Sequence, residues 1–371
     1  MSTVLDWSPQ QDAALHAVKA WIAMPKKTRP QVFHLFGYAG TGKTTLAKEI
    51  AAMVKGDVLF MCFTGKAALV LKKKGCDGAS TIHSAIYKTK QDERTGTHKF
   101  RLNKDSPVRG AALVIVDEVS MVDGTVGKDL LSFNTPILVL GDPFQLPPIR
   151  GEGFFDTPKP EVLLTEIHRQ AKDNPIIRLS MDVRNGMRLK PGQYGTSRII
   201  QRADVDGEEV LKADQVLVGM NKTRQGYNRR IRQLKEFEDR FPVMGDRLVC
   251  LRNNHEKGLL NGSLWKPTKL GDSGDFIDLR VESLDDDACP EVDVNIPRQF
   301  FLGTEQDLDW RIKRENDEFT FGWALTGHKA QGSQWDNVFV VDESAVFKEN
   351  AARWQYTAIT RAAERVTVLI D

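Results

Sequence analysis

The chain opens with a helical pattern and then alternates short apolar runs with helical stretches. Residues 8–24 predict a helix, because Ser8 is a favourable N-cap, Pro9 stands at the first helical position and apolar residues recur at helical spacing. Such short apolar runs are typical of buried parallel strands, and the helices between them predict an open α/β sheet through residue 150. The four runs lie at 32–36, 58–63, 113–116 and 137–140.

A second set of apolar runs, at 216–220, 338–341 and 366–370, predicts a second α/β lobe. Two segments interrupt the alternation. Residues 87–107 are polar and basic around a Thr-Gly turn, which predicts a hairpin that protrudes from the first lobe. Residues 242–318 are rich in Gly, Asp and short β-like runs, which predicts a β-rich insertion in the second lobe.

The expected fold class is therefore α/β with two lobes. The predicted domains are a first lobe at 1–150 that carries the hairpin 87–107, a second lobe at 151–241 plus 319–371, and the β-rich insertion at 242–318.

Composition narrows the class of protein. The 371 residues include 52 basic and 50 acidic ones, which gives a formal charge of +2. Any binding of phosphate must therefore depend on local basic patches. The four cysteines stand far apart without a CxxC pair, which argues against a zinc site or a disulfide framework. No apolar run approaches the roughly 18 residues that a membrane span needs. We expect a soluble protein of a reducing, cytoplasmic compartment, with no membrane contact.

The strongest chemical signal is the segment 37–44, Gly-Tyr-Ala-Gly-Thr-Gly-Lys-Thr, which matches GxxxxGK[ST] in full between a predicted strand and a predicted helix. Glycines in such a loop let backbone N–H groups close around phosphate oxygens. Lys43 adds a cation for the β and γ phosphates, and the Thr44 hydroxyl is a ligand for Mg²⁺. ATP and Mg²⁺ are the expected cofactors, and the nucleotide is expected to contact Gly37, Gly40, Thr41, Gly42, Lys43, Thr44 and Thr45.

Acidic and amide side chains follow the next two apolar runs. Asp117 and Glu118 come directly after one run, at the edge where open α/β sheets bind their ligands. We expect Asp117 to hold Mg²⁺ through water and Glu118 to act as general base on the attacking water. Gln145 follows the other run and could sense the γ-phosphate, although an isolated glutamine is more often a surface residue. These motifs predict an NTPase without saying what the hydrolysis drives.

Basic residues in the second half suit phosphate recognition but leave alternatives open. Arg169 and Arg361 are candidates to stabilise transition-state charge, and either could equally be a surface salt-bridge residue. Residues 221–235 form either a phosphate-binding face or a merely solvated helix. They contain no acid and six basic residues, Lys222, Arg224, Arg229, Arg230, Arg232 and Lys235.

The order of the motifs resembles superfamily 1 helicases of the 5′-to-3′ branch, RecD-like and Dda-like enzymes, over nearly the whole chain. The resemblance implies two RecA-like P-loop lobes, with the hairpin as a strand-separation pin and the insertion as an SH3-like domain that braces it. The segments that carry it, in family order, lie at 7–11, 37–44, 63–68, 80–84, 117–121, 141–148, 165–170, 327–333 and 356–362.

The resemblance also implies roles for individual residues. Gln11, or else Gln10, would bond the adenine edge, Arg169 and Arg361 would act as arginine fingers, and residues 326–334 would couple the nucleotide site, at Gly332, to the strand. Short donors such as Thr64 and Thr81 would position backbone phosphates without reading sequence. The strand would contact Phe63, Thr64, Lys66, Thr81, His83, Phe100, Asn221, Thr326, His328 and Lys329.

Three departures or ambiguities limit these roles. The family commonly has Ala-Pro where this chain has Cys62-Phe63, and Phe63 could stack on a base or belong to the core. Phe100 is the hairpin aromatic best placed to cap an end pair, or it could tuck against the lobe. The phosphate loop begins at Gly37, without the extra N-terminal domain of long RecD-like proteins, so the chain resembles a stand-alone phage helicase more closely.

The expected function is an ATP-dependent 5′-to-3′ single-stranded DNA translocase and DNA helicase. We expect it to act as a monomer on single-stranded and forked duplex DNA, in a bacterial or phage-infected cytoplasm, beside other replication, repair or recombination proteins. Two alternatives stay open. One is an RNA helicase of the same superfamily, because phosphate contacts do not distinguish sugars. The other is an ATP-gated binding or loading protein that does not unwind.

Overall fold

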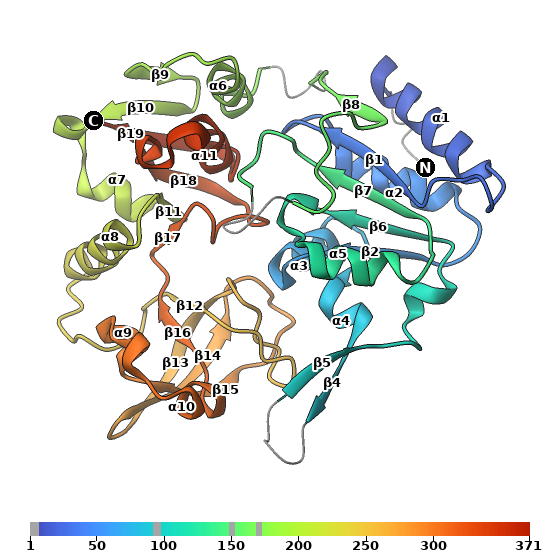
Figure 1. Cartoon of the computed structure of the whole chain (residues 1–371). Helices are drawn as coiled ribbons and strands as arrows, with labels where there is room; N and C mark the ends of the chain where they lie inside the picture. Colours follow the sequence, from blue (N-terminus) through green and yellow to red (C-terminus); the bar gives the residue numbers. More distant parts are fainter. Residues whose placement is uncertain (1–6, 92–97, 148–152, 168–172) are drawn as a thin grey trace. The chain divides into compact units, whose positions relative to one another are not determined.

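A computed structural model describes residues 7–91, 98–147, 153–167 and 173–371 (Figure 1). The chain divides into two compact units, Met1–Ser180 and Met181–Asp371. Each contains a mostly parallel sheet with helices packed on it, so the predicted two-lobed α/β class is confirmed. Among the described residues, no helix has the length and apolar character that a membrane span requires.

The first unit is a six-stranded parallel sheet in the order β3-β2-β6-β7-β1-β8. Its strands are β1 (Val32–Gly37), β2 (Val58–Cys62), β3 (Ser80–Thr81), β6 (Leu113–Asp117), β7 (Ile137–Gly141) and β8 (Val162–Leu164). Its helices are α1 (Pro9–Ala23), α2 (Lys43–Met53), α3 (Gly65–Lys73), α4 (Ile82–Ile86) and α5 (Gly124–Leu131), and α6 (Pro175–Arg184) crosses the unit boundary.

Alternating side chains of the central strands build two cores, one on each face of this sheet. Leu113 and Ile115 of β6 pack into the core that contains α1, α2 and α3. Val114 and Val116 face the opposite core, which contains residues of α4 and α5. Because successive side chains of a strand point to opposite faces, a strand covered on both sides must be apolar throughout. This explains why the sequence shows uninterrupted apolar runs rather than alternation.

The first helix matches its prediction in detail. Ser8 caps α1, accepting a hydrogen bond from the Gln11 backbone N–H at 3.3 Å, while the Gln11 side chain accepts one from the Ser8 N–H at 3.0 Å. This reciprocal capping box satisfies two backbone donors that the helix leaves unpaired. Pro25 follows the C-cap and ends the helix.

The boundary of the first lobe lies later than predicted. β8 pairs in parallel with β1, so the first sheet includes a strand beyond residue 150, and the first unit ends at Ser180. The strand contributes three residues at the edge of the sheet, and Leu163 is exposed. So short an edge strand leaves no periodic pattern from which its partner could be inferred.

The second unit contains a six-stranded sheet in the order β17-β11-β18-β19-β10-β9, parallel except for β9. Its strands are β9 (Gly192–Tyr194), β10 (Ser197–Gln201), β11 (Gln215–Val218), β17 (Ala324–Thr326), β18 (Trp335–Val341) and β19 (Ala362–Ile370). Its helices include α7 (Gly207–Lys212), α8 (Asn221–Leu234) and α11 (Ala351–Ile359).

The segment predicted to be β-rich forms an antiparallel sheet in the order β15-β14-β13-β12-β16. Its strands are β12 (Leu248–Cys250), β13 (Leu264–Ser273), β14 (Phe276–Ser283), β15 (Val292–Pro297) and β16 (Phe319–Phe321), with the short helices α9 (Gln299–Leu302) and α10 (Trp310–Glu315). The last strand falls just after the expected end of the insertion at 318. Its likeness to an SH3 domain stays a prediction.

The hairpin of the first unit consists of β4 (Tyr87–Gln91) and β5 (His98–Leu102), paired antiparallel with Thr89 opposite Phe100. The turn that the sequence predicts, at 94–97, lies outside the described residues. Tyr87 anchors the base of the hairpin, because its hydroxyl donates to Asp129 Oδ2 of α5 at 2.6 Å. Burial and this carboxylate raise the pKa of Tyr87 well above its usual range.

Arg232 corrects the expectation of a uniformly basic face on α8. Its guanidinium lies 3.0 Å from the buried carboxylate of Asp246 and donates at 2.7 Å each to the carbonyls of Asp239 and Phe241. The same group covers the ring of Phe321 at 4.2 Å. Arg232 therefore serves the interior of the second unit, and the basic face is limited to its neighbours on α8.

We predict that Arg232→Ala lowers the free energy of unfolding by roughly 3–5 kcal/mol, because it leaves the Asp246 carboxylate buried without its cation. Urea denaturation followed by tryptophan fluorescence measures the change. Arg230→Ala is the matched control on the same helix, where the exposed side chain should contribute within about 0.5 kcal/mol. Equal small effects of both substitutions would contradict the structural role of Arg232.

Candidate functional site

The phosphate loop leaves β1 and enters α2, and two of its glycines are required by the space around them. A Cβ at Gly37 would lie 2.6 Å from Thr41 Oγ1 and 2.9 Å from Leu164 Cβ. Gly42 adopts φ +82°, and a Cβ there would lie 2.6 Å from Gln11 Nε2. At Gly37 no larger side chain has room, and at Gly42 only glycine combines the left-handed φ with such close packing. The loop therefore holds its backbone N–H groups at the start of α2.

Lys43 lies over the loop, where its Nζ donates to the carbonyls of Gly37 at 2.6 Å and Tyr38 at 3.0 Å. A pocket of about 370 Å³ opens beside it. Lys48 and Lys74 also line this pocket, and Lys48 Nζ donates to the Lys74 carbonyl at 2.9 Å. Both were missed by the sequence analysis. The sequence held one indication for Lys48. It follows Thr44 by four residues, which places both side chains on the same face of a helix.

Both glutamines predicted to bond adenine already make hydrogen bonds within the protein. Gln11 is 3% exposed, and its Nε2 donates to the Thr41 carbonyl at 3.0 Å while its Oε1 takes part in the capping box. Gln10 Oε1 accepts the backbone N–H groups of Thr165 at 2.8 Å and Glu166 at 2.9 Å. Gln11 therefore binds the backbone of the phosphate loop, and Gln10 binds the backbone of residues 165–166.

Asp117 and Glu118 stand at the end of β6 in a constrained turn. Glu118 adopts φ +55°, and its backbone N–H donates to Asp117 Oδ1 at 2.8 Å. Burial, with the neighbouring Glu118 carboxylate, raises the pKa of Asp117 to about 6. The fold thus holds two acids together at a place where a cation is favoured electrostatically.

The residues present fit Mg²⁺. The Thr44 hydroxyl and the Asp117 carboxylate are oxygen donors, the kind of ligand this ion prefers. Burial is the main cause of the raised pKa of Asp117, the Glu118 carboxylate adds to it and Lys43 lowers it in part, so a cation bound beside the two acids would favour the charged form. Thr44 and Asp117 would hold the ion, which would supply charge neutralisation at the phosphates.

Gln145 follows β7, the strand that lies between β6 and β1. Its side chain is 8% exposed, and its Oε1 has no hydrogen-bond partner among the described residues. Its backbone N–H donates to the Asp142 carbonyl at 3.1 Å. A buried acceptor without a partner costs free energy, so such a group is better explained by a site than by a surface loop. The interpretation of Gln145 as surface decoration is wrong.

Three predicted strand contacts in the first unit lie where helices begin. Thr64 caps α3, accepting the Ala67 N–H at 3.2 Å, and Thr81 caps α4, accepting the Ser84 N–H at 3.1 Å. Lys66, in the first turn of α3, is 5% exposed. Helix N-termini attract anions, so these two starts at the ends of β2 and β3 suit phosphate.

Four aromatic rings cluster next to these helix starts. His83 lies 5.7 Å from Phe63, 5.6 Å from Tyr87 and 6.5 Å from Phe100, measured between ring centroids. Phe63 is half-buried against the core, while Phe100 is 66% exposed. Burial lowers the pKa of His83, so its ring is neutral at pH 7. Phe63 thus packs on the core with one side and on His83 with another, and Phe100 does not tuck into the lobe.

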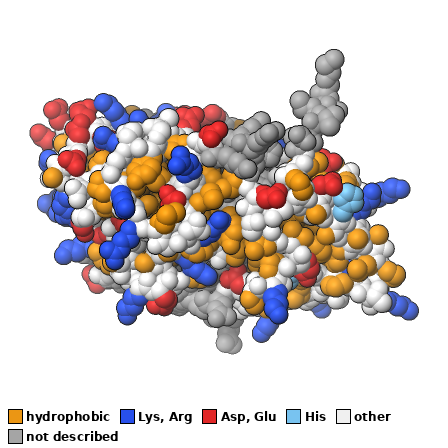
Figure 2. All heavy atoms as spheres, turned by 90° about the horizontal axis from the view of Figure 1, so that it is seen from above, with side chains coloured by type: hydrophobic (Ala, Val, Ile, Leu, Met, Phe, Trp, Pro, Cys, Tyr) orange, Lys and Arg blue, Asp and Glu red, His pale blue; other side chains and the backbone are white. Residues whose placement is uncertain are grey.

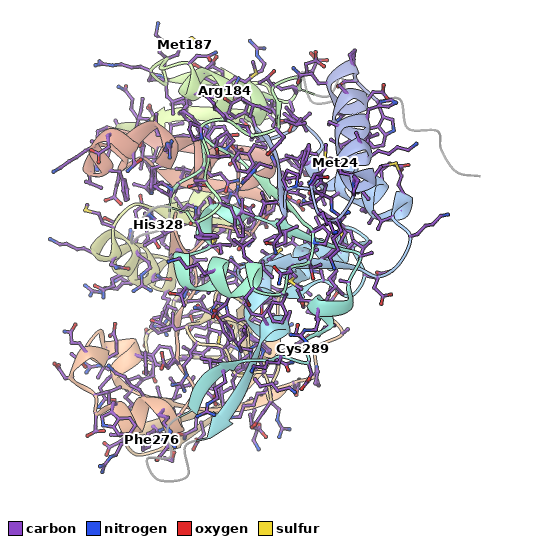
Figure 3. All side chains as sticks on the ribbon, turned by 45° about the vertical axis from the view of Figure 1, so that its right-hand side comes forward. Met24, Arg184, Met187, Phe276, Cys289 and His328 are labelled. Carbon is purple, nitrogen blue, oxygen red and sulfur yellow. The ribbon has the colours of Figure 1, made fainter. Side chains whose placement is uncertain are left out.

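In the second unit, residues 326–334 pack on aromatic rings and on the β-rich segment. Figure 3 labels His328, which follows β17. Its ring lies against Phe347 at 5.6 Å, and Phe347 stacks on Trp354 at 5.6 Å, measured between ring centroids. Lys329 Nζ donates to Asn261 Oδ1, and burial lowers the pKa of Lys329. Thr326 ends β17, and Gly332 has φ +74°. Lys329 therefore joins this segment to the β-rich sheet.

Arg361 is 6% exposed and donates to the carbonyls of Thr357 at 3.1 Å and Ser333 at 3.3 Å. It is not the surface salt-bridge residue that the sequence left open. Its partner Ser333 belongs to the segment 326–334, so the two predicted motifs of the second unit meet. Arg169 lies outside the described residues. Asn221 begins α8 and is exposed.

Charge is distributed in small patches. Figure 2 shows Lys and Arg side chains interspersed with Asp and Glu over the face in view, with hydrophobic side chains between them. This agrees with the formal charge of +2 and leaves recognition to local sites.

Comparison with known proteins gives the family. Residues 9–204 match the AAA domain model, and residues 321–369 match the UvrD-like helicase C-terminal domain. The chain is 28% identical over 362 residues to the ATP-dependent RecD2 DNA helicase of Deinococcus radiodurans, covering 89% of this chain and 46% of that protein. It is 25% identical over 431 residues to an uncharacterized protein of Methanocaldococcus jannaschii, covering 91% of this chain and 36% of that protein. The chain thus spans less than half the length of these relatives.

Solved Pif1 helicases share the fold. A Bacteroides Pif1 in complex with ADP-AlF3 and ssDNA is 18% identical with a TM-score of 0.57, covering 98% of this chain and 92% of that one. Pif1 from Candida albicans is 18% identical with a TM-score of 0.56, covering 99% of this chain and 95% of that one. The matched AAA domain takes in more than half of the 371 residues. The UvrD-like match and the RecD2 relative agree with the resemblance to RecD-like helicases that the motif order indicated. The chain itself belongs to the AAA domain family.

Proposed function

We propose that this chain is an ATP-dependent 5′-to-3′ translocase on single-stranded DNA and a DNA helicase. The observation that carries the proposal is the convergence of three chemical groups on one sheet edge. The acid pair, Gln145 and the phosphate loop follow β6, β7 and β1, three neighbouring parallel strands, at their carboxyl ends. Ligands of open α/β sheets bind at this edge. The RecD2 relative is an ATP-dependent DNA helicase, which agrees with the proposal.

Each residue of the site has a separate role in the proposed hydrolysis. Loop N–H groups and Lys43 hold the β and γ phosphates, and Thr44 with Asp117 would hold Mg²⁺. Glu118 accepts the proton of the attacking water, and Gln145 orients that water through its unpaired Oε1. Arg361 and Arg169 stabilise charge in the transition state. ATP binding would draw the two lobes together and hydrolysis would release them, which moves the strand.

Strand contacts in the proposal come from both units. Thr64, Lys66 and Thr81 lie at helix starts in the first, and Asn221, Thr326 and Lys329 lie in the second. Phe63 and His83 offer ring faces or edges to a base. The exposed Phe100 on β5 is the wedge that caps the last base pair of a fork. The SH3-like identity of the β-rich segment, monomeric action and a cytoplasmic location belong to the same proposal.

Two alternatives are distinguished by experiment. An RNA helicase of this superfamily would show ATPase stimulation by poly-U at least equal to that by poly-dT. A non-enzymatic, ATP-gated loading protein would bind ATP without turnover. The intact Lys43, Asp117, Glu118 and Gln145 favour an enzyme, because a degenerate site would be expected to have lost one of them.

The central test is unwinding of duplexes that carry a single-stranded tail on the 5′ or the 3′ side, with ATP and Mg²⁺. We expect unwinding of the 5′-tailed duplex only. Lys43→Ala should lower ATPase turnover and unwinding by roughly two to three orders of magnitude, as expected for loss of a preorganised charge at the phosphates. Unwinding that survives in Lys43→Ala, or that requires a 3′ tail, would refute the mechanism or its polarity respectively.

The wedge is tested by Phe100→Ala. We expect the number of base pairs opened per ATP hydrolysed to fall by about tenfold, because one stacking contact is worth roughly 1–3 kcal/mol. ATPase stimulation by single-stranded DNA should be unchanged, since Phe100 lies away from the phosphate loop. Phe100→Trp is the matched control and should retain coupling. Equal coupling in the alanine variant would exclude Phe100 as the wedge.

The acid pair is tested by stability. Asp117→Asn should abolish hydrolysis yet raise the free energy of unfolding at pH 7 by roughly 1–2 kcal/mol, because the wild-type carboxyl is charged with a raised pKa in the fold. An acid with a raised pKa loses stability as pH rises from about 4 to 6, so the gain should vanish near pH 4, where Asp117 is protonated. Thermal unfolding without nucleotide and metal measures this; a variant less stable than wild type at pH 7 would contradict it.

A further inference from the structure

A pocket of about 670 Å³ lies within the second unit, between α8 and the segment around α9. Its volume falls in the range of small-molecule binding sites. None of the residues proposed for hydrolysis, and not Phe100, belongs to its lining.

One side of the pocket is aromatic. Phe301 and Phe321 lie 5.1 Å apart at 57°, and the guanidinium of Arg232 covers Phe321 at 4.2 Å. Both rings are partly exposed and line the pocket. A flat aromatic ligand finds ring faces and edges here, with a cation fixed behind one ring.

The pocket lining also contains buried polar atoms without hydrogen-bond partners among the described residues. Arg224 Nε is buried and has no hydrogen-bond partner among the described residues, and the same is true of Glu305 Oε2. Both residues line the pocket, yet they form no ion pair with each other. A buried donor and a buried acceptor left unpaired are unfavourable, so a ligand that supplies both an acceptor and a donor would relieve them.

The pocket reaches the predicted strand contacts. Asn221, Thr326 and Lys329 belong to its lining, and each is a residue that we expect at the DNA strand. Gly303 lies on the other wall, where a Cβ would stand 3.3 Å from Gln225 Nε2. The pocket is therefore lined in part by three of the proposed strand contacts.

We propose that this pocket receives one nucleobase of the bound single strand, turned out of the stack. The proposal rests on the proposed function, since it needs a strand at Asn221 and Thr326. A base has a flat π-face for Phe301 and an edge with both donors and acceptors for Glu305 and Arg224. A base suits this lining better than a phosphate alone, because Glu305 and the two rings offer it contacts that a phosphate cannot use, beside basic residues such as Arg229 and Arg240.

The test compares binding of the full chain to oligothymidylate and to an abasic strand of equal length, by fluorescence anisotropy at fixed salt. Wild type should favour the strand with bases. Arg224→Gln should reduce that preference by roughly five- to tenfold, as expected for loss of one buried hydrogen bond, and leave abasic binding nearly unchanged. Glu305→Gln, which alters the other polar group assigned to the edge of the base, should reduce the preference in the same direction.

Arg230→Gln is the matched control, because Arg230 is exposed on α8 and outside the pocket lining. It should leave the preference for bases unchanged. Thermal unfolding of each variant checks the fold. If Arg224→Gln or Glu305→Gln keeps the wild-type preference, or weakens the binding of both strands equally, the base pocket is wrong. Failure of the wild type to bind either strand would instead contradict the proposed function itself.

Discussion

The parallel pairing of β6, β7 and β1 is the constraint on which the candidate hydrolysis site depends. Neighbouring parallel strands end at the same edge, so Asp117 and Gln145, about 75 and 100 positions after the phosphate loop, come close to it without any local signal between them. The alternation of β6 side chains between two cores fixes its register, because a shift of one residue would move Leu113 and Ile115 to the wrong face. The apolar cores thus set the position of Glu118 and of Asp117, whose raised pKa means that its charged carboxylate opposes folding.

Local patterns predicted much of this molecule. The capped helix α1, the central strands and the phosphate loop follow from periodicity and short motifs, and the structure has them within a few residues of their expected bounds. Long-range pairing was not predictable. β8 is too short to show a period, and Arg232 resembles its exposed neighbours on α8 until Asp246, fourteen residues later, is brought beneath it. Lys74 lines the nucleotide pocket for the same reason, since nothing near it in sequence marks it.

Some of the buried polar atoms without hydrogen-bond partners lie at the proposed sites, while others, such as Gln215 Oε1 in β11, lie elsewhere among the described residues. Arg232 and Asp246 satisfy each other fully, as a structural pair in an interior should. Gln145 and Arg224 instead each keep a buried polar atom unpaired, and Asp117 keeps a raised pKa. The sequence pointed to Gln145 and Asp117 through motifs. It could not point to Arg224 as different from Arg230, because only the fold separates the two faces of α8.

The Arg232 contacts also bear on how the second unit comes apart. One guanidinium on α8 binds the carbonyls of Asp239 and Phe241, the Asp246 carboxylate and the ring of Phe321 in β16. The helix and the antiparallel sheet therefore share a single buried anchor. Neither can open without exposing a charge, so the two should exchange their amide hydrogens as one cooperative block. We therefore expect the inserted sheet, although it has a core of its own, to unfold together with α8.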